Sequence, residues 1–111
     1  MAEILGKMIA ADVIVMATPV YFYTMDAQMK TLIDRCVARY TEISNKAFYF
    51  IATAAAGRGA MERTADAMRG FTDCLPGAEV KGVVYGSGVY QKGEVMDTKA
   101  FQEAYRLGKK V

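Results

Sequence analysis

Apolar residues follow two different patterns along the chain. Three short segments are almost continuously apolar and rich in β-branched or aromatic residues, which predicts strands that are buried on both faces of a parallel sheet. These predicted strands span residues 13–17, 47–52 and 79–85. In four other segments, the apolar residues recur at helical spacing and charged residues occupy the opposite face. They predict helices over residues 2–11, 24–36 and 61–75, and a last helix that begins at Asp97-Thr98.

Strands that alternate with helices predict βαβ units and a single domain over residues 1–111. The expected fold class is therefore α/β, with three layers, a parallel sheet of three strands, and four helices. We expect the first strand to end at Thr18-Pro19, because proline donates no hydrogen bond to a sheet. Thr24 is the expected N-cap of the second helix, since a threonine hydroxyl accepts hydrogen bonds from the first turn.

The predicted pattern begins with a helix whose apolar face needs a sheet to pack on. It also leaves the strand at residues 13–17 as a bare apolar edge, which native proteins usually cover because free edges promote aggregation. We therefore expect either that the fold is truncated and lacks an N-terminal βαβ half, or that a partner chain covers the edge. For this reason we expect a homo-oligomer rather than a well-behaved monomer.

The composition excludes several kinds of site and partner. A net charge of +2 is too small to indicate a nucleic-acid partner. The chain has no histidine, which excludes histidine metal sites and Ser-His-Asp triads. Cys36 and Cys74 form no CxxC pair, which is typical of reduced thiols in a cytoplasmic protein. No signal-peptide pattern follows Met1, and the apolar run at 13–17 is too short to span a bilayer, so we expect a cytoplasmic location and no membrane partner.

The loops after the three predicted strands are the first place to look for a ligand, because open parallel sheets bind ligands beyond the carboxyl ends of their strands. The loop at residues 18–23 contains three consecutive aromatic residues. The loop at 53–59 consists mostly of small residues, which let a flat ligand approach the backbone N–H groups closely. The loop at 86–90 adds two glycines and a tyrosine. Together the three loops predict a pocket for a planar, partly polar ring.

Each loop has a plainer interpretation when it is considered alone. Aromatic residues after a strand more often pack in the core or at its rim, and an alanine-glycine loop is most often a tight turn. Neither Gly57-Arg58-Gly59 nor Gly86-Ser87-Gly88 extends to a dinucleotide-binding fingerprint, and no P-loop pattern is present. The ligand interpretation therefore depends on the coincidence of all three loops at one edge of the sheet.

Residues 11–35 read ADVIVMATPVYFYTMDAQMKTLIDR. This stretch resembles the strand, flavin loop and helix of the NAD(P)H-dependent FMN reductase family. In that family an acidic residue and an apolar strand precede Ser/Thr-Pro-x-Tyr and a helix with Met-Lys and Ile-Asp-Arg. Residues 90–109 resemble the C-terminal region of the iron–sulfur flavoprotein-like branch. The resemblance extends over essentially the whole chain, and it implies a flavodoxin-like fold, bound FMN, and NAD(P)H as co-substrate.

The resemblance also implies which residues contact the cofactor. Thr18, Pro19, Val20, Tyr21 and Phe22 match the loop along the flavin ring and ribityl chain, and Thr53, Ala54, Ala55 and Gly57 match the loop at the other edge of the ring. Family members begin with a strand, a Ser-rich loop that holds the FMN phosphate, a helix and a second strand, none of which this chain matches. We therefore predict no phosphate site, no iron–sulfur or other metal site, and no catalytic side chain, because the flavin itself carries the hydride chemistry.

Three functions remain open. The first is an FMN-dependent NAD(P)H oxidoreductase of the flavin or quinone reductase type, with a small molecule or a redox protein as electron acceptor. In this case Arg58 is a candidate cation beside the reduced ring, although a solvated loop arginine is an equally good interpretation. The second is a truncated flavodoxin-like segment that folds as an oligomer and binds no flavin. The third, an electron carrier, is disfavoured because carriers usually present an acidic docking face and this chain has a pI of about 8.5.

Overall fold

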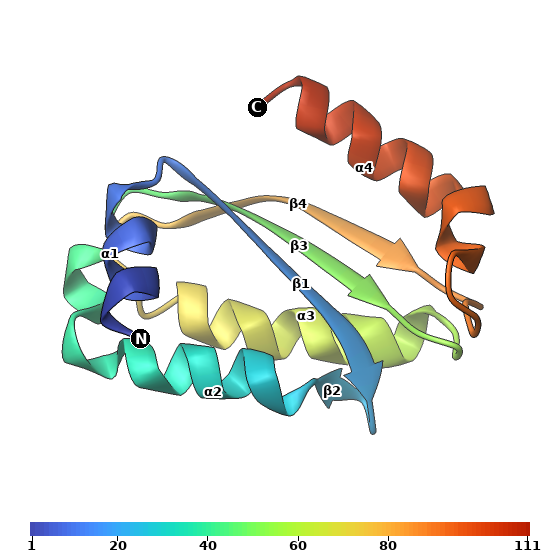
Figure 1. The fold of residues 1–111 in the computed structure, drawn as a ribbon, viewed down its shortest axis with the longest axis horizontal. Coiled ribbons are helices and arrows are strands. Elements are labelled where there is room, and N and C mark those ends of the chain that lie inside the picture. The colour runs from blue at the N-terminus through green and yellow to red at the C-terminus, as the bar shows by residue number, and fades with distance from the viewer.

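Four strands form one mixed sheet in the order β2-β1-β3-β4 (Figure 1). The computed structural model describes residues 1–111. Its strands are β1 (Val13–Tyr21), β2 (Thr24–Met25), β3 (Ala47–Thr53) and β4 (Glu79–Gly86), and its helices are α1 (Ala2–Ala10), α2 (Ala27–Arg35), α3 (Arg58–Thr72) and α4 (Lys99–Lys109). Three short 3₁₀ turns are η1 (Cys36–Ala38), η2 (Tyr40–Glu42) and η3 (Glu94–Asp97). The strands β1, β3 and β4 are parallel, and β2 runs antiparallel to the end of β1.

The helices cover the sheet on both faces, so the predicted three-layer α/β architecture is confirmed. Helices α1, α2 and α3 lie on one face and α4 lies on the other (Figure 1). Between the sheet and the three helices, Phe48 and Phe50 of β3 are fully buried, and the Phe48 ring meets the Phe71 ring edge-on at 6.4 Å. Burying one such side chain contributes about 1.5–3 kcal/mol, so β3 anchors the core. No helix here combines the length and the apolar character needed to cross a membrane.

The last helix is held much more loosely than the other three. Ala100 is its only buried residue, while Phe101 and Tyr105 remain 40% and 60% exposed. Its contacts with the sheet run mainly to β4. The half of this sheet face that belongs to β1 is therefore poorly covered, and Val15 is 57% exposed there.

The prediction of three strands is wrong, because the chain forms a fourth strand by turning back on itself. β1 does not end at Thr18-Pro19 but stays paired with β3 as far as Pro19 and Thr53. A proline is tolerated there because β1 has no other parallel neighbour, so a missing donor on the open side costs no ladder hydrogen bond. The chain then reverses in a two-residue hairpin, and β2 pairs with Val20 and Tyr21 of β1.

The hairpin turn has an unusual backbone. Its two central residues, Phe22 and Tyr23, both have positive φ angles, +50° and +67°. Two such residues match the twist of hairpin strands, but glycine and asparagine normally occupy these positions because bulky side chains clash in left-handed backbone. Both side chains lie at the surface, where Phe22 is 99% exposed and Tyr23 is 56% exposed.

Thr24 is not the N-cap of the second helix, because it lies in β2. Asp26 takes that position, and its carboxylate accepts a hydrogen bond of 2.8 Å from the Met29 amide. The Asp26 amide in turn donates to the Thr18 hydroxyl at 3.0 Å. The hairpin is thereby tied at its base to both β1 and α2. An aspartate serves the N-cap as well as a threonine does, and adds a favourable charge at the positive end of the helix dipole.

The outer edge of β1 is largely open, as the sequence indicated. Only Val20 and Tyr21, at its carboxyl end, pair with another strand on that side. From Val13 to Pro19, the backbone groups on this side have no strand partner within the chain. Open edges of this length are typically covered by another strand or another chain.

The turn generates a stability prediction. We expect Phe22→Gly to raise the free energy of unfolding by about 1 kcal/mol, because glycine adopts positive φ without a steric cost and Phe22 has almost no buried surface to lose. Thermal unfolding should show a Tm about 4 °C higher. Tyr90→Gly is the matched control, since Tyr90 is 85% exposed but is not among the residues with positive φ. A Tm that falls in Phe22→Gly would contradict the proposed strain.

Candidate functional site

The three loops predicted to hold a ligand meet at the carboxyl edge of the sheet. A cavity of about 500 Å³ lies between them. Its walls are formed by the end of β1, by the loop after β3, and by the loop after β4. The lining residues are Pro19, Val20, Tyr21, Thr53, Ala54, Ala55, Val89, Tyr90, Gln91, Lys92 and Val95. Open parallel sheets bind ligands at this edge, so the cavity is the candidate functional site.

Backbone hydrogen bonds hold two of the walls together. The Ala54 amide donates to the Gly86 carbonyl at 2.9 Å, and the Val89 amide donates to the Ala54 carbonyl at 3.1 Å. Gly86 lies where the two walls are closest. A Cβ atom there would come within 3.2 Å of the Thr53 methyl carbon and 3.4 Å of a Val95 methyl carbon. The absence of a side chain at Gly86 therefore allows this close approach.

The loop after β3 presents free backbone donors. The amides of Ala55, Ala56 and Gly57 make no hydrogen bond within the protein. They lead directly into α3, whose N-cap is Gly57 and has no side-chain cap. The unpaired N–H groups at a helix start carry a partial positive charge. This loop can therefore donate hydrogen bonds to the polar edge of a ring in the cavity.

Six of the nine predicted cofactor-binding residues line the cavity: Pro19, Val20, Tyr21, Thr53, Ala54 and Ala55. Thr18 does not line it, because its side chain is buried and its hydroxyl is used by the hairpin. Phe22 lies at the exposed tip of the hairpin. Gly57 lies just behind the cavity wall, at the start of α3.

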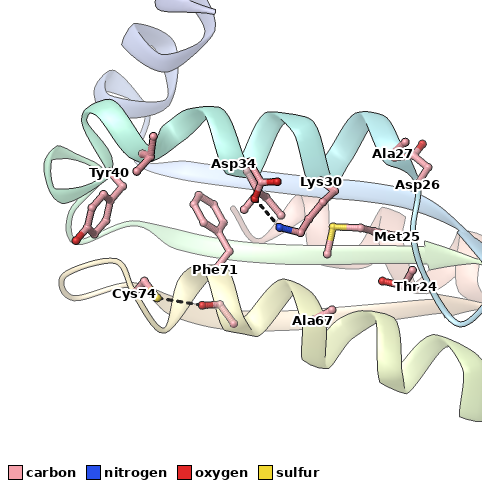
Figure 2. Close-up of a pocket in the computed structure, with 13 residues that line it drawn as sticks. Thr24, Met25, Asp26, Ala27, Lys30, Asp34, Tyr40, Ala67, Phe71 and Cys74 are labelled. Carbon is pink, nitrogen blue, oxygen red and sulfur yellow. Dashed lines mark hydrogen bonds and ion pairs between the residues drawn. The ribbon is translucent and has the colours of Figure 1, made fainter.

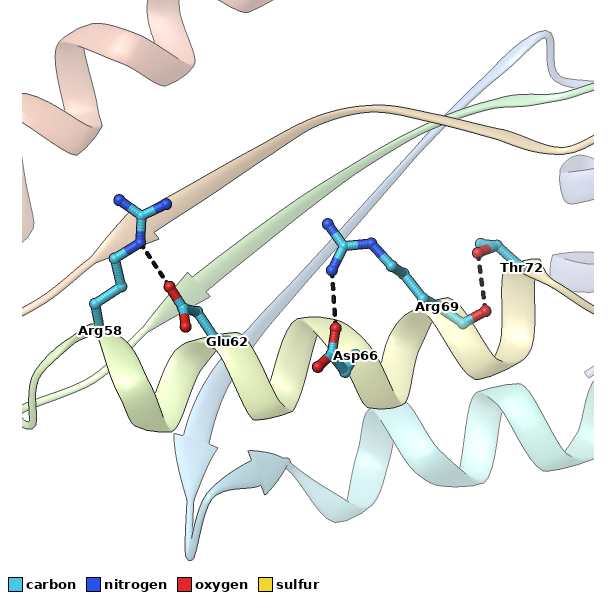
Figure 3. Close-up of polar contacts among 5 residues, drawn as sticks. All are labelled: Arg58, Glu62, Asp66, Arg69 and Thr72. Atoms are coloured by element: carbon cyan, nitrogen blue, oxygen red, sulfur yellow. Dashed lines mark hydrogen bonds and ion pairs between the residues drawn. The ribbon is translucent and has the colours of Figure 1, made fainter.

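Arg58 points away from the cavity. Its guanidinium carbon lies 4.7 Å from the centre of the Tyr85 ring, and its Nε forms a 3.1 Å ion pair with Glu62 (Figure 3). Arg58 is not among the residues that line the cavity. Its charge is therefore engaged by α3 and β4 rather than aimed at a ligand.

Five lining residues lie beyond the nine predicted cofactor-binding residues: Val89, Tyr90, Gln91, Lys92 and Val95. They belong to the irregular segment between β4 and α4, where Gly88 and Gly93 adopt positive φ. Lys92 brings a cation to the cavity, the role that the sequence had suggested for Arg58. The sequence places the loop at residues 86–90 beside the predicted pocket, but its glycines mark a loop without revealing that residues 91–95 continue the wall.

Glu94 braces this third wall. Its carboxylate accepts hydrogen bonds from the amides of Gln91 at 2.9 Å and Tyr90 at 3.0 Å. These hydrogen bonds favour the ionised form, so the Gln91 amide first and the Tyr90 amide second lower the pKa of Glu94 below its usual value. Two residues of the cavity wall are therefore positioned by one carboxylate.

A larger groove lies elsewhere, between α2 and α3 (Figure 2). It measures about 820 Å³ and is mostly apolar, with Phe71 and Met25 among its lining residues. Most of its lining residues belong to α2 and α3, whose backbone groups already bond to one another. Lys30 and Asp34, which border it, form an ion pair with each other. The groove therefore lacks the convergent free polar groups of the cavity at the carboxyl edge of the sheet. We take that cavity as the functional site, although it is the smaller of the two.

No histidine, cysteine or carboxylate side chain lines the cavity. No three acidic or cysteine residues lie close enough to hold a metal ion. Cys36 is buried in the core, and burial raises the pKa of its thiol. Cys74 lies in the α2–α3 groove. The cavity thus offers a shaped surface, backbone donors and one cation, which suit the binding of a cofactor that supplies its own chemistry.

The bracing of the third wall generates a pH prediction. The pKa of Glu94 is lower in the folded state than in the unfolded state. The stability that its ionised carboxylate contributes is therefore complete above the unfolded-state pKa of about 4.3, and it is lost as the pH falls through the folded-state pKa. The NMR shifts of the Tyr90 and Gln91 amide protons should therefore titrate together with a midpoint below about 4.3. Glu94→Gln should abolish this titration, whereas Glu103→Gln, at an exposed glutamate that accepts no hydrogen bond, should preserve it. Independent midpoints for the two amides would contradict the shared carboxylate.

Solved structures of similar fold include the Trp repressor binding protein from Bacillus subtilis and an NADPH-quinone reductase from P. pentosaceus. The first is 22% identical, with a TM-score of 0.80 over 96% of this chain and 70% of the other chain. The second is 13% identical, with a TM-score of 0.74 over 99% of this chain and 74% of the other chain. At these identities the likeness establishes the fold, which is flavodoxin-like. No curated protein matches the sequence.

The sequence profile of a protein family provides the assignment. The profile described as NADPH-dependent FMN reductase matches residues 1–91, which include all four strands and two of the three walls of the cavity in full. This agrees with the resemblance of residues 11–35 on sequence alone. The chain therefore belongs to the NADPH-dependent FMN reductase family.

Proposed function

We propose that this chain binds the flavin ring of FMN in the cavity at the carboxyl edge of the sheet and acts as an NAD(P)H-dependent oxidoreductase of the flavin or quinone reductase type. The observation that carries the proposal is the convergence of three separate loops on one cavity of about 500 Å³. Family membership supports the same cofactor. When bound, FMN accepts a hydride from NAD(P)H and passes the electrons to an acceptor, so the protein has only to bind and orient it.

The residues of the cavity fit a flavin ring. Pro19, Val20 and Ala54 provide apolar surface, while Tyr21 and Tyr90 provide aromatic rings from two different loops. Planar rings stack favourably on such side chains. The free amides of the loop after β3 supply donors for the carbonyl and nitrogen atoms along the polar edge of the ring.

The same residues fit a phosphate less well. Lys92 is the only cation that lines the cavity, and Thr53 provides its only aliphatic hydroxyl. A phosphate group normally requires several converging donors or a glycine-rich loop at a helix start. We therefore expect the loops of this chain to contact chiefly the ring, so that most of the binding free energy comes from the part that FMN and riboflavin share.

Lys92 is the residue that we expect to tune the ring. It contributes a positive charge to a cavity that contains no carboxylate among its lining residues. A nearby cation stabilises the added negative charge of a reduced ring more than it stabilises the neutral oxidised ring. This charge raises the midpoint potential of the bound flavin and favours its reduction.

The open edge of β1 favours a second proposal about the state of the protein. Along this edge the backbone from Val13 to Pro19 has no strand partner, and Val15 exposes its side chain on the poorly covered face. We propose that the chain is a homo-oligomer in which another copy covers this surface. In the alternative function, this oligomer forms but binds no flavin.

The flavin proposal is tested by titrating FMN and riboflavin with the purified chain and following the quenching of flavin fluorescence. We expect saturable binding of both, with dissociation constants that differ by less than about tenfold, which corresponds to 1.4 kcal/mol. Tyr21→Ala should weaken both by about fivefold or more, because a stacked aromatic ring contributes about 1 kcal/mol beyond its buried area. In Lys92→Gln, the midpoint potential of the bound flavin should become more negative.

Two comparisons make this test decisive. Tyr40→Ala is the matched control for Tyr21→Ala, because Tyr40 borders the α2–α3 groove and should leave both dissociation constants unchanged. Absence of binding by either flavin would refute the proposed function. It would leave the family assignment and the fold intact, and it would favour the oligomer without flavin.

The oligomer proposal is tested by light scattering coupled to size exclusion. We expect a mass of at least twice 12.2 kDa at micromolar concentration. Val15→Lys places a charge on the exposed β1 face and should shift the protein towards the monomer, because burying an unpaired charge is costly. Val37→Lys is the control, since Val37 is 72% exposed on the opposite side of the sheet. A sharp wild-type monomer peak with a cooperative melt would refute the proposal.

A further inference from the structure

The aromatic turn between β1 and β2 has a cost that the fold does not explain. Phe22 and Tyr23 both occupy left-handed backbone, which disfavours any residue with a bulky side chain. A two-residue hairpin of this kind forms more easily with asparagine and glycine. Neither ring is buried in the core, so packing does not compensate for the strain. Strain of this kind is typical of functional sites, where it is retained because it positions a group.

One contact singles out Tyr23. The guanidinium carbon of Arg63 lies 4.8 Å from the centre of the Tyr23 ring, within the range of a cation–π interaction. Arg63 belongs to α3, which is 40 residues further along the chain than the turn. The contact therefore fastens the tip of the hairpin to a rigid helix.

Arg63 differs from Arg58 and Arg69 of the same helix in its charged neighbours. Arg58 pairs with Glu62 and Arg69 pairs with Asp66, each at 3.1 Å on the same helix (Figure 3). Arg63 has no acidic partner within ion-pair distance. The charge of Arg63 is thus available to Tyr23, whereas those of its two neighbours are neutralised locally.

The turn is coupled to the cavity through one residue. Tyr21 lines the cavity and also closes the turn. It immediately precedes Phe22 and Tyr23, and it pairs with Thr24, which immediately follows them. On the other side, Met25 is buried in the core and the Asp26 amide is tied to Thr18. Tyr21 therefore lies between the fixed base of the hairpin and its tip.

We propose that Arg63 is a positioning residue that acts through Tyr23: it holds the strained turn against α3 and thereby sets the Tyr21 ring as a wall of the flavin site. The inference rests on the proposed function for its effect on flavin, but not for its effect on the hairpin. It assigns a role to a residue that does not line the cavity. It also explains why a tyrosine is accommodated at a position where glycine would remove the strain.

The test is a double-mutant cycle of Arg63→Gln and Tyr23→Gly, with riboflavin as the probe. Riboflavin carries no phosphate, so the loss of a positive charge cannot weaken its binding by simple attraction. An exposed cation–π contact corresponds to a two- to fivefold change in an equilibrium constant. We expect each single variant to raise the dissociation constant by about this factor, and the double variant to show no further increase. Tyr23→Phe keeps the ring and should bind like the wild type.

Arg69→Gln is the matched control, because it removes an arginine of the same helix whose partner is Asp66. It should leave riboflavin binding unchanged. If Arg63→Gln and Tyr23→Gly act additively, the two residues are not coupled and the proposal fails. It also fails if Arg69→Gln weakens binding as much as Arg63→Gln does.

A second measurement does not depend on flavin. Hydrogen exchange of the Asp26 amide and the β2 amides reports on the hairpin itself. In Arg63→Gln these amides should exchange two- to fivefold faster than in Arg69→Gln. If the wild type binds no flavin, the proposed function fails, and the exchange rates alone decide whether Arg63 holds the turn. Equal exchange rates in Arg63→Gln and Arg69→Gln would refute the proposal that Arg63 holds the turn.

Discussion

The parallel pairing of β3 with both of its neighbours is the constraint on which the rest of the structure depends. β3 contacts β1 over seven residue pairs and β4 over seven more, and its two phenylalanines are fully buried against the helices. Because the pairing is parallel, the carboxyl ends of all three strands reach the same edge of the sheet. Three loops that are far apart in the sequence therefore meet, and the cavity is a direct result of strand direction rather than of any motif.

The cavity relies on backbone more than on side chains. Amide–carbonyl hydrogen bonds join the loops after β3 and β4, the loop after β3 keeps free amides, and the carboxylate of Glu94 holds two further amides in place. Backbone groups are less sensitive to substitution than side chains, provided that small residues keep the strands and loops close together. This is consistent with a cavity whose lining includes two alanines and no carboxylate.

The sequence predicted the parts of the fold that depend on burial, and missed those that depend on local backbone geometry. The run at 47–52 became β3 almost without change, because continuous apolar character leaves a buried strand few alternatives. The extension of β1 through Pro19 was missed because residue type does not reveal that one side of the strand is open. Nothing in the sequence indicated a hairpin, since Phe22 and Tyr23 are residues that such turns normally avoid. Lys92 was missed because the fold of an irregular loop decides where its side chains point.

The loose attachment of α4 has a consequence for how the site is maintained. With Ala100 as its only buried residue, α4 can detach from the sheet at a smaller free-energy cost than the rest of the domain needs to unfold. Val95, which lines the cavity, lies only a few residues before this helix, so we expect the third wall and α4 to open as one local unit. A ligand that binds only the closed wall must stabilise this unit by mass action. The far end of the chain, distant from the cavity, is therefore thermodynamically linked to its occupancy.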